Sequence, residues 1–307
     1  MLTSRFFFTT AYGVGSFFVY FMIIRMMYKK WNEYKATFFK LYIAEFCFNF
    51  ITFVNQFVTL RAPQNTCNDC FFSFLFEPQD APDKQYFPLN FFFTIHFSMA
   101  FVQYSMTLLI SLNRLTMVIL VTNYESYWRP IYPFFLIAIA VFPISQTWPI
   151  FVNNAYFLYN PQLQGYSTRT TANVTELVDF LLLFMTSITV LTALVNILSI
   201  VRLICLADRI TGAERNLFNV SFVSFFIQVL ACGNTVILHY AVIDANPLSQ
   251  WSQYCQYLMP FISDLLTVSH PWTLLIFSSK VRASMIHTYF PQYNGRLFSS
   301  SASSMLY

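Results

Sequence analysis

The chain has 307 residues, of which 57% are hydrophobic, 20% are aromatic and only 10% are charged, and its formal net charge is +4. A soluble domain carries roughly a quarter charged residues, and 38 Phe against 17 basic and 13 acidic side chains could not be covered by a polar surface. This composition excludes a cytosolic enzyme and a nucleic-acid-binding protein, and it predicts an integral membrane protein.

Seven apolar stretches are long enough to cross a bilayer as helices, which takes roughly 20 mainly apolar residues. They span about residues 6–28, 38–60, 89–113, 131–152, 177–201, 216–241 and 254–279. Strand-like alternation with Gly or Asn turns is absent, which argues against an outer-membrane barrel. The loops 61–88 and 153–176 carry no pattern for an independent core. We therefore predict an all-α, GPCR-like bundle of seven helices that forms one domain over 1–307.

The first stretch is predicted to be a mature helix rather than a cleaved signal peptide. Its apolar core is too long for a typical signal, and Arg25-Met26-Met27-Tyr28-Lys29-Lys30 follows in place of a small-residue cleavage pattern.

The distribution of basic residues predicts the orientation. Of the 17 Lys and Arg residues, all but Arg5, Arg61, Lys84 and Arg169 fall on one side of the seven spans. Since the side rich in Lys and Arg is cytoplasmic, we expect the N-terminus outside and the C-terminal tail inside. The sequon at Asn173 then falls in an outer loop, and Asn173 is a predicted glycosylation site.

The segment 280–307 is predicted to be a cytoplasmic tail. Apolar residues between Val281 and Phe290, followed by Pro291, are spaced as in a short amphipathic helix on the inner leaflet. A frayed tail with incidental apolar residues explains the same pattern equally well.

Three of the six cysteines, Cys67, Cys70 and Cys255, lie on the oxidising outer side. Three cannot all pair within one chain. A disulfide between Cys255 and either Cys67 or Cys70 would tie the first outer loop to the top of the seventh helix. A zinc site at Cys67 and Cys70 is the weaker alternative, because no second ligand pair is visible nearby, and we predict no metal.

Polar side chains form one stripe on each of two spans. The stripe of the second span consists of Glu45, Asn49, Thr52 and Gln56, and that of the third consists of His96, Gln103, Thr107, Ser111 and Arg114. Polar groups in lipid usually face the bundle interior, so we expect Glu45, Asn49, Gln103, Asp264 and His270 to form an interior network. For any single residue, an interhelical hydrogen bond of about 1 kcal/mol is a sufficient explanation. A proton or cation site formed by Glu45 and Asp264 is the alternative.

Motifs of catalysis are missing from the sequence. His-Glu-x-x-His and Gly-x-Ser-x-Gly are absent, and no glycine closely precedes Asp179 or Asp264, as an intramembrane aspartyl protease requires. We predict that the protein is not an enzyme and uses no cofactor.

Two stretches resemble a known family. The first is Ser111-Leu112-Asn113-Arg114-Leu115-Thr116, leading to Tyr124-Glu125-Ser126-Tyr127-Trp128, and the second is Pro260-Phe261-Ile262-Ser263-Asp264-Leu265-Leu266-Thr267, followed by Pro271-Trp272. Together they resemble the nematode serpentine receptor class gamma (Srg) chemoreceptors, which belong to the seven-transmembrane GPCR superfamily. Glu214 before Asn216-Leu217 also fits this pattern.

The resemblance implies a chemosensory receptor in the plasma membrane of sensory neurons. Such a receptor binds an external odorant or pheromone and signals to a heterotrimeric G protein. By analogy with rhodopsin-like receptors, Asn113 and Arg114 would form the G-protein-coupling site, although Asn113 stands where those receptors carry an acid. Ser269-His270-Pro271-Trp272 likewise replaces their Asn-Pro-x-x-Tyr.

The ligand pocket is expected between the outer thirds of the third, fifth, sixth and seventh helices. Candidate lining residues are Phe92, Phe93, His96, His239 and Tyr257, and an aromatic lining suits a partly apolar ligand. The alternative function is a small ion- or proton-coupled transporter or channel that uses Glu45 and Asp264. The odd number of spans and the absence of a visible repeat count against it.

Overall fold

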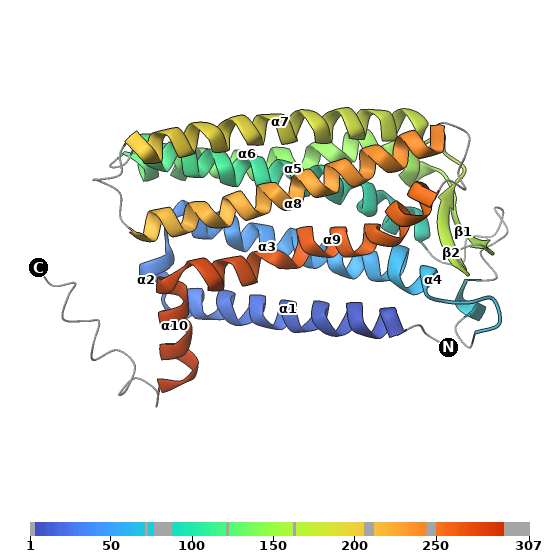
Figure 1. Cartoon of the computed structure of the whole chain (residues 1–307), viewed down its shortest axis with the longest axis horizontal. Helices are drawn as coiled ribbons and strands as arrows, with labels where there is room; N and C mark the ends of the chain where they lie inside the picture. The colour runs from blue at the N-terminus through green and yellow to red at the C-terminus, as the bar shows by residue number, and fades with distance from the viewer. Residues whose placement is uncertain are drawn as a thin grey trace, which may run out of the picture.

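The computed structural model describes residues 4–70, 73–76, 88–120, 123–161, 164–205, 212–243 and 250–291. Within these ranges the chain forms a bundle of seven long helices with a small β-hairpin at one end (Figure 1). The long helices are α1 (Ser4–Lys29), α3 (Thr37–Gln56), α5 (Leu89–Leu120), α6 (Tyr124–Val152), α7 (Thr175–Cys205), α8 (Gly212–Ile243) and α9 (Gln250–Phe277). The predicted all-α membrane bundle is thereby confirmed.

Shorter elements connect and cap the bundle. α2 (Trp31–Tyr34) joins α1 to α3, and α3 continues through a π-helical segment, η1 (Phe57–Arg61), into α4 (Ala62–Gln64). A 3₁₀ turn, η2 (Ser73–Leu75), follows, and α10 (Ser279–Tyr289) comes after α9.

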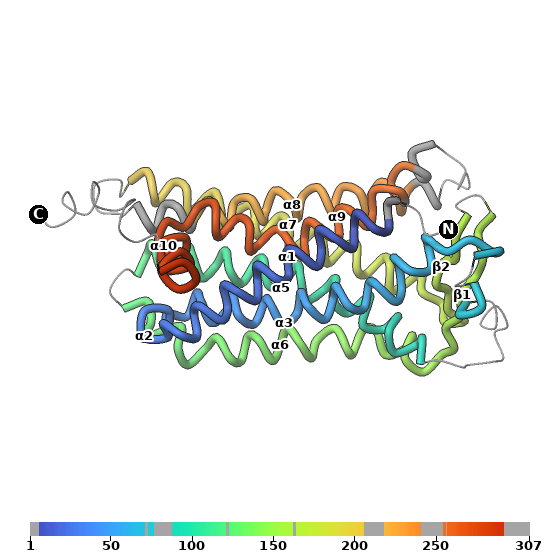
Figure 2. Tube along the Cα trace, turned by 90° about the horizontal axis from the view of Figure 1, so that it is seen from below, coloured from blue at the N-terminus to red at the C-terminus, as the bar shows by residue number. Residues whose placement is uncertain are grey.

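Six of the described helices are apolar and long enough to cross a membrane: α1, α3 with its extension, α5, α6, α7 and α8. α9 does not meet this criterion, and it carries the polar residues Ser263, Asp264 and His270. It nevertheless runs along the bundle, packed against α8, α1 and α3 (Figures 1 and 2). Contacts with the neighbouring helices therefore stabilise the position of α9, whose own apolarity is not sufficient to predict a membrane span.

Two helices extend beyond the apolar stretches from which they were predicted. α5 reaches Leu120 instead of residue 113, and α6 begins at Tyr124 instead of residue 131. The charged residues Arg114 and Arg129 end an apolar stretch, but they do not end a helix, because both have good helix propensity. The segment that connects the two helices is therefore shorter than predicted.

A large cluster of buried apolar residues lies where α1, α3 and α5 meet. Tyr20, Ile23 and Leu41 are fully buried there. On the outer surface, by contrast, Phe134, Leu183 and Ile204 are each at least 67% exposed. Such large apolar side chains on the outside are typical of a surface that faces lipid rather than water.

The β-hairpin consists of β1 (Ala155–Asn160) and β2 (Gly165–Thr170), which pair antiparallel with Ala155 opposite Thr170 and Asn160 opposite Gly165. Its apolar face is buried against Phe76 and Leu89. As the sequence indicates, this segment has no core of its own, and it forms strands by packing on the bundle.

α10 crosses the far end of the bundle, beside the last turns of α1 and α9 (Figures 1 and 2). The Ser278 hydroxyl caps it by accepting from the Val281 N–H at 3.3 Å. The Tyr34 hydroxyl donates to Ser284 Oγ at 2.9 Å, and burial raises the pKa of Tyr34 above its ordinary value. Residues 279–289 therefore form a helix rather than a frayed tail. Residues 292–307 lie outside the described residues.

The predicted disulfide was wrong. Cys67 bonds to Cys70 instead, and Cys255 is a buried free thiol. The turn after α4 brings the two nearby cysteines together, with their Cα atoms 5.1 Å apart. Because both sulfurs form this bond, the pair is not a thiolate site for zinc.

Candidate ligand and signalling sites

A cavity of about 90 Å³ lies inside the bundle, between α3, α5, α7, α8 and α9. Its polar lining comes mainly from Thr52, Gln56, His96, Gln103, Asn234 and Ser263. Its apolar lining includes three methionines, Met99, Met185 and Met259. A mostly apolar lining with a few polar groups is the usual composition of a small-molecule site, and this cavity is smaller than the roughly 300–1,000 Å³ that such sites commonly span.

Of the predicted pocket residues, only His96 lines this cavity. Phe93 packs on the hairpin cluster, and Phe92 contacts the ring of Phe91. His239 Nε2 lies 3.2 Å from a carboxylate oxygen of Asp179, and Tyr257 is 54% exposed. The prediction used depth in the membrane, which does not determine which way a side chain faces around its helix.

Hydrogen bonds join the cavity lining to neighbouring helices. The Gln56 side-chain amide donates to Ser263 Oγ, which links α3 to α9. The Gln103 amide donates to Asn49 Oδ1 at 3.3 Å and to Thr267 Oγ1 at 3.2 Å, which links α5 to α3 and α9. A molecule in the cavity therefore contacts side chains that hold three helices together.

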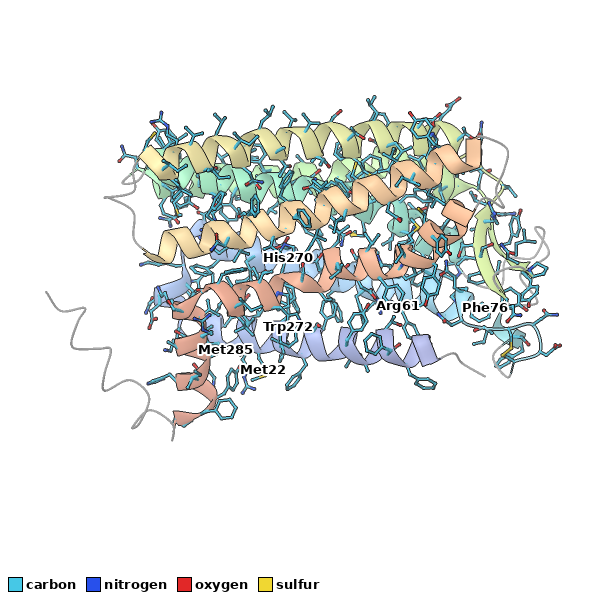
Figure 3. All side chains as sticks on the ribbon, viewed as in Figure 1. Met22, Arg61, Phe76, His270, Trp272 and Met285 are labelled. Atoms are coloured by element: carbon cyan, nitrogen blue, oxygen red, sulfur yellow. A yellow bond between two sulfur atoms is a disulfide. The ribbon has the colours of Figure 1, made fainter. Side chains whose placement is uncertain are left out.

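A second polar cluster lies around His270, which Figure 3 labels between α8 and α9. His270 Nε2 is 3.0 Å from Glu45 Oε1 and 3.1 Å from Ser224 Oγ. All three side chains are buried, and they come from α9, α3 and α8. Glu45 and His270 thus share a cluster, as predicted from the sequence, but Asp264 does not belong to it.

Asp264 instead pairs with Arg61, nearer the hairpin end of the bundle (Figure 3). The Tyr12 hydroxyl donates to the other carboxylate oxygen of Asp264, so that α1, η1 and α9 meet at one point. The Arg61 guanidinium also lies 4.3 Å from the centre of the Phe53 ring. One ion pair and one hydroxyl thus stabilise a carboxylate that is 1% exposed.

The sequence predicts Arg61 in an outer loop and does not predict this pairing. The helix continues through the π-helical segment Phe57–Arg61, and the wider π turn changes the direction of the side chains that follow. The available signal was Asp264 itself, because an acid in a membrane helix requires a partner.

At the opposite end, Arg114 is 2% exposed, and its guanidinium carbon lies 3.4 Å from the centre of the Phe38 ring. Asn113 beside it is fully buried. Both predicted coupling residues therefore lie inside the bundle in this packing, and neither is presented on its surface.

The segment Tyr124–Trp128 clamps this end of the bundle. The Glu125 carboxylate accepts from the Thr37 N–H at 2.7 Å and from the Thr37 hydroxyl at 2.8 Å, which caps the first turn of α3. The Trp128 indole donates to Thr116 Oγ1 at 2.6 Å. Glu125 and Trp128 thus tie the start of α6 to α3 and α5, a role that the sequence does not predict.

Comparisons with known proteins agree with this architecture. The model of the Srg family chemoreceptors matches residues 6–285. Serpentine receptor class gamma-31 of Caenorhabditis elegans is 33% identical over 93% of this chain and 92% of its own length. Class gamma-20 of the same organism is 30% identical over 66% of this chain and 56% of its own length. The chain belongs to the Srg family of chemoreceptors.

Proposed function

We propose that the protein is a chemosensory G-protein-coupled receptor in the plasma membrane of sensory neurons. It binds an external small molecule in the cavity between α3, α5, α7, α8 and α9. The hairpin end faces outward, and the α10 end faces the cytoplasm and a heterotrimeric G protein. The observation that carries this proposal is the cavity, whose lining residues Gln56 and Gln103 hydrogen-bond across three helices.

The ligand acts by its differential affinity for two bundle packings. Contact with Gln56 or Gln103 changes the balance of the bonds that join α3, α5 and α9, and a ligand can shift the equilibrium only by that difference. In the described packing Arg114 is covered by Phe38. The signalling packing exposes Arg114 and Asn113 to the G protein.

The transporter alternative receives less support. It requires Glu45 and Asp264 to act together, but Glu45 pairs with His270 and Asp264 pairs with Arg61. Two carboxylates with separate partners suit structural roles better than a shared relay.

Arg114→Ala tests the proposal in cells that carry a G-protein reporter and are exposed to pooled small-molecule extracts of nematodes. We expect the unaltered chain to give an extract-dependent signal that Arg114→Ala abolishes at equal surface amount. Arg202→Ala is the matched control, because Arg202 is exposed at the same end of the bundle and should be dispensable. Normal signalling by Arg114→Ala would contradict the coupling role.

A further inference from the structure

The cavity lining restricts the charge of a ligand, an inference that rests on the proposed function. Among the described residues, no Asp, Glu, Lys or Arg lines the cavity, and the lining imidazole of His96 has the neutral Thr59 hydroxyl, rather than an acid, 3.5 Å from its Nδ1. Arg61 and Asp264 follow the lining residues Leu60 and Ser263 along the chain, but they form an ion pair with each other. Moving an ion from water into such a site without a counter-charge is strongly unfavourable. The lining therefore favours an uncharged ligand.

Gln56 supplies a specific polar contact. Its side chain is only 4% exposed and lines the cavity. The amide nitrogen donates to Ser263, whereas the amide oxygen, Oε1, has no hydrogen-bond partner within the described part of the chain. A buried acceptor without a donor is destabilising. A ligand that carries a hydroxyl or an N–H group would satisfy it once the Gln56 side chain turns this oxygen toward the cavity.

The apolar part of the lining suits a flexible carbon skeleton. Met99, Met185 and Met259 come from α5, α7 and α9. Methionine side chains are unbranched and polarisable, and they adapt to irregular apolar shapes. The cavity thus offers one acceptor on α3 and an adaptable apolar wall.

We propose that the cavity binds a small uncharged amphiphile, an alcohol or an amide with an aliphatic body. Its hydroxyl or N–H donates to Gln56 Oε1, and its carbon skeleton packs against the three methionines. Carboxylates and ammonium ions of the same skeleton are excluded.

The test measures binding to the purified full-length chain in lipid nanodiscs, without a G protein. The probes are hexanol, hexanone, hexanoate and hexylammonium at neutral pH, and the readout is the concentration dependence of thermal stabilisation. We expect hexanol to bind roughly tenfold more tightly than hexanone, which cannot donate. The two ions should give no stabilisation.

Gln56→Leu should abolish the preference for hexanol over hexanone. Asn55→Leu is the matched control, because Asn55 is another buried amide of α3 that does not line the cavity. It should retain the preference. If Gln56→Leu does not fold, Ser263→Ala replaces it, since it removes the partner that orients the amide, and it should weaken the preference.

Three results would overturn the proposal: no stabilisation by hexanol, equal binding of hexanoate or hexylammonium, or an unchanged preference in Gln56→Leu. Failure of the receptor function gives a different result. Probe binding with no Arg114-dependent signal would contradict signalling and leave the ligand class intact. An Arg114-dependent signal from a charged molecule would contradict only the ligand class.

Discussion

Arg61 and Asp264 form a buried ion pair whose two members depend on each other. Arg61 is 2% exposed and Asp264 is 1% exposed, so neither charge has water as a substitute partner. Replacing a whole buried pair by apolar residues is often neutral, whereas removing one member leaves an unpaired charge and costs about 3–5 kcal/mol. The pair therefore determines how α9 seats against η1.

We predict that Asp264→Ala or Arg61→Ala lowers the stability of the protein by about 3–5 kcal/mol. The double variant should recover part of this loss, because it leaves no unpaired charge. Thermal unfolding of the purified protein measures both effects. A double variant that loses the sum of the two single effects would show that the residues do not act as a pair.

At the scale of single elements, the contact between α6 and α3 depends on one carboxylate. Glu125 accepts both the N–H and the hydroxyl of Thr37, the first residue of α3. Phe38, the next residue, covers Arg114. The cap therefore supports the packing in which Arg114 is buried.

Glu125→Ala should raise ligand-independent signalling. Loss of a helix cap costs about 1 kcal/mol, which shifts the ratio of two packings about fivefold. Because the cap stabilises the packing that buries Arg114, loss of the cap favours the packing that exposes Arg114. Basal reporter activity at equal surface amount measures the change. Glu125→Gln retains an acceptor, and its basal activity should lie between those of the unaltered chain and Glu125→Ala. Unchanged or lower basal activity in Glu125→Ala would contradict this role for the cap.

The sequence predicts six of the long helices well, because their apolar stretches are sufficient to place them, whereas α9 is less apolar and packs against α8, α1 and α3. It predicts the clusters poorly. Asp264 pairs with Arg61 because a π-helical segment carries the helix past the expected end at residue 60. The hairpin was missed because its apolar side chains become buried only against Phe76 and Leu89, which are distant in the sequence. Such contacts depend on tertiary packing, which the pattern of apolar residues along the sequence does not reveal.

At the scale of the whole molecule, the hairpin covers the end of the bundle nearest the π-helical segment. The Thr168 hydroxyl donates to the Thr59 carbonyl at 2.9 Å, and the Tyr166 hydroxyl donates to Asn68 Oδ1 at 2.9 Å. Gly165 lies so close to α4 that a Cβ atom there would be 2.5 Å from the Gln64 carbonyl oxygen. Glycine is thus required for the hairpin to seat.

Gly165→Ala should destabilise the protein by about 1–3 kcal/mol, because the added methyl group meets backbone that cannot move aside cheaply. Gly233→Ala in α8 is the matched control, since a Cβ atom at that position has no neighbour within 4 Å. Denaturation of the two purified variants measures the difference. Equal stability of both would show that the hairpin shifts without cost.

The proposed orientation makes a prediction about Asn173. This residue is exposed just before α7, at the hairpin end of the bundle. If that end faces the lumen during synthesis, Asn173→Gln should remove a glycan and increase electrophoretic mobility. Asn219→Gln is the control, because the sequon at Asn219 lies within α8. A glycan that persists in Asn173→Gln, or an unaltered chain without one, would contradict this assignment.

The pairing of Asp264 has a consequence for biogenesis. An aspartate at the centre of a helix opposes its release from the translocon into lipid by roughly 2.5–3.5 kcal/mol. The partners of Asp264, Tyr12 and Arg61, belong to the first two long helices, which leave the ribosome before α9 is made. We therefore expect α9, the last of the seven long helices, to integrate by packing against helices that are already inserted in the bilayer. The order of synthesis thus becomes part of how the receptor assembles.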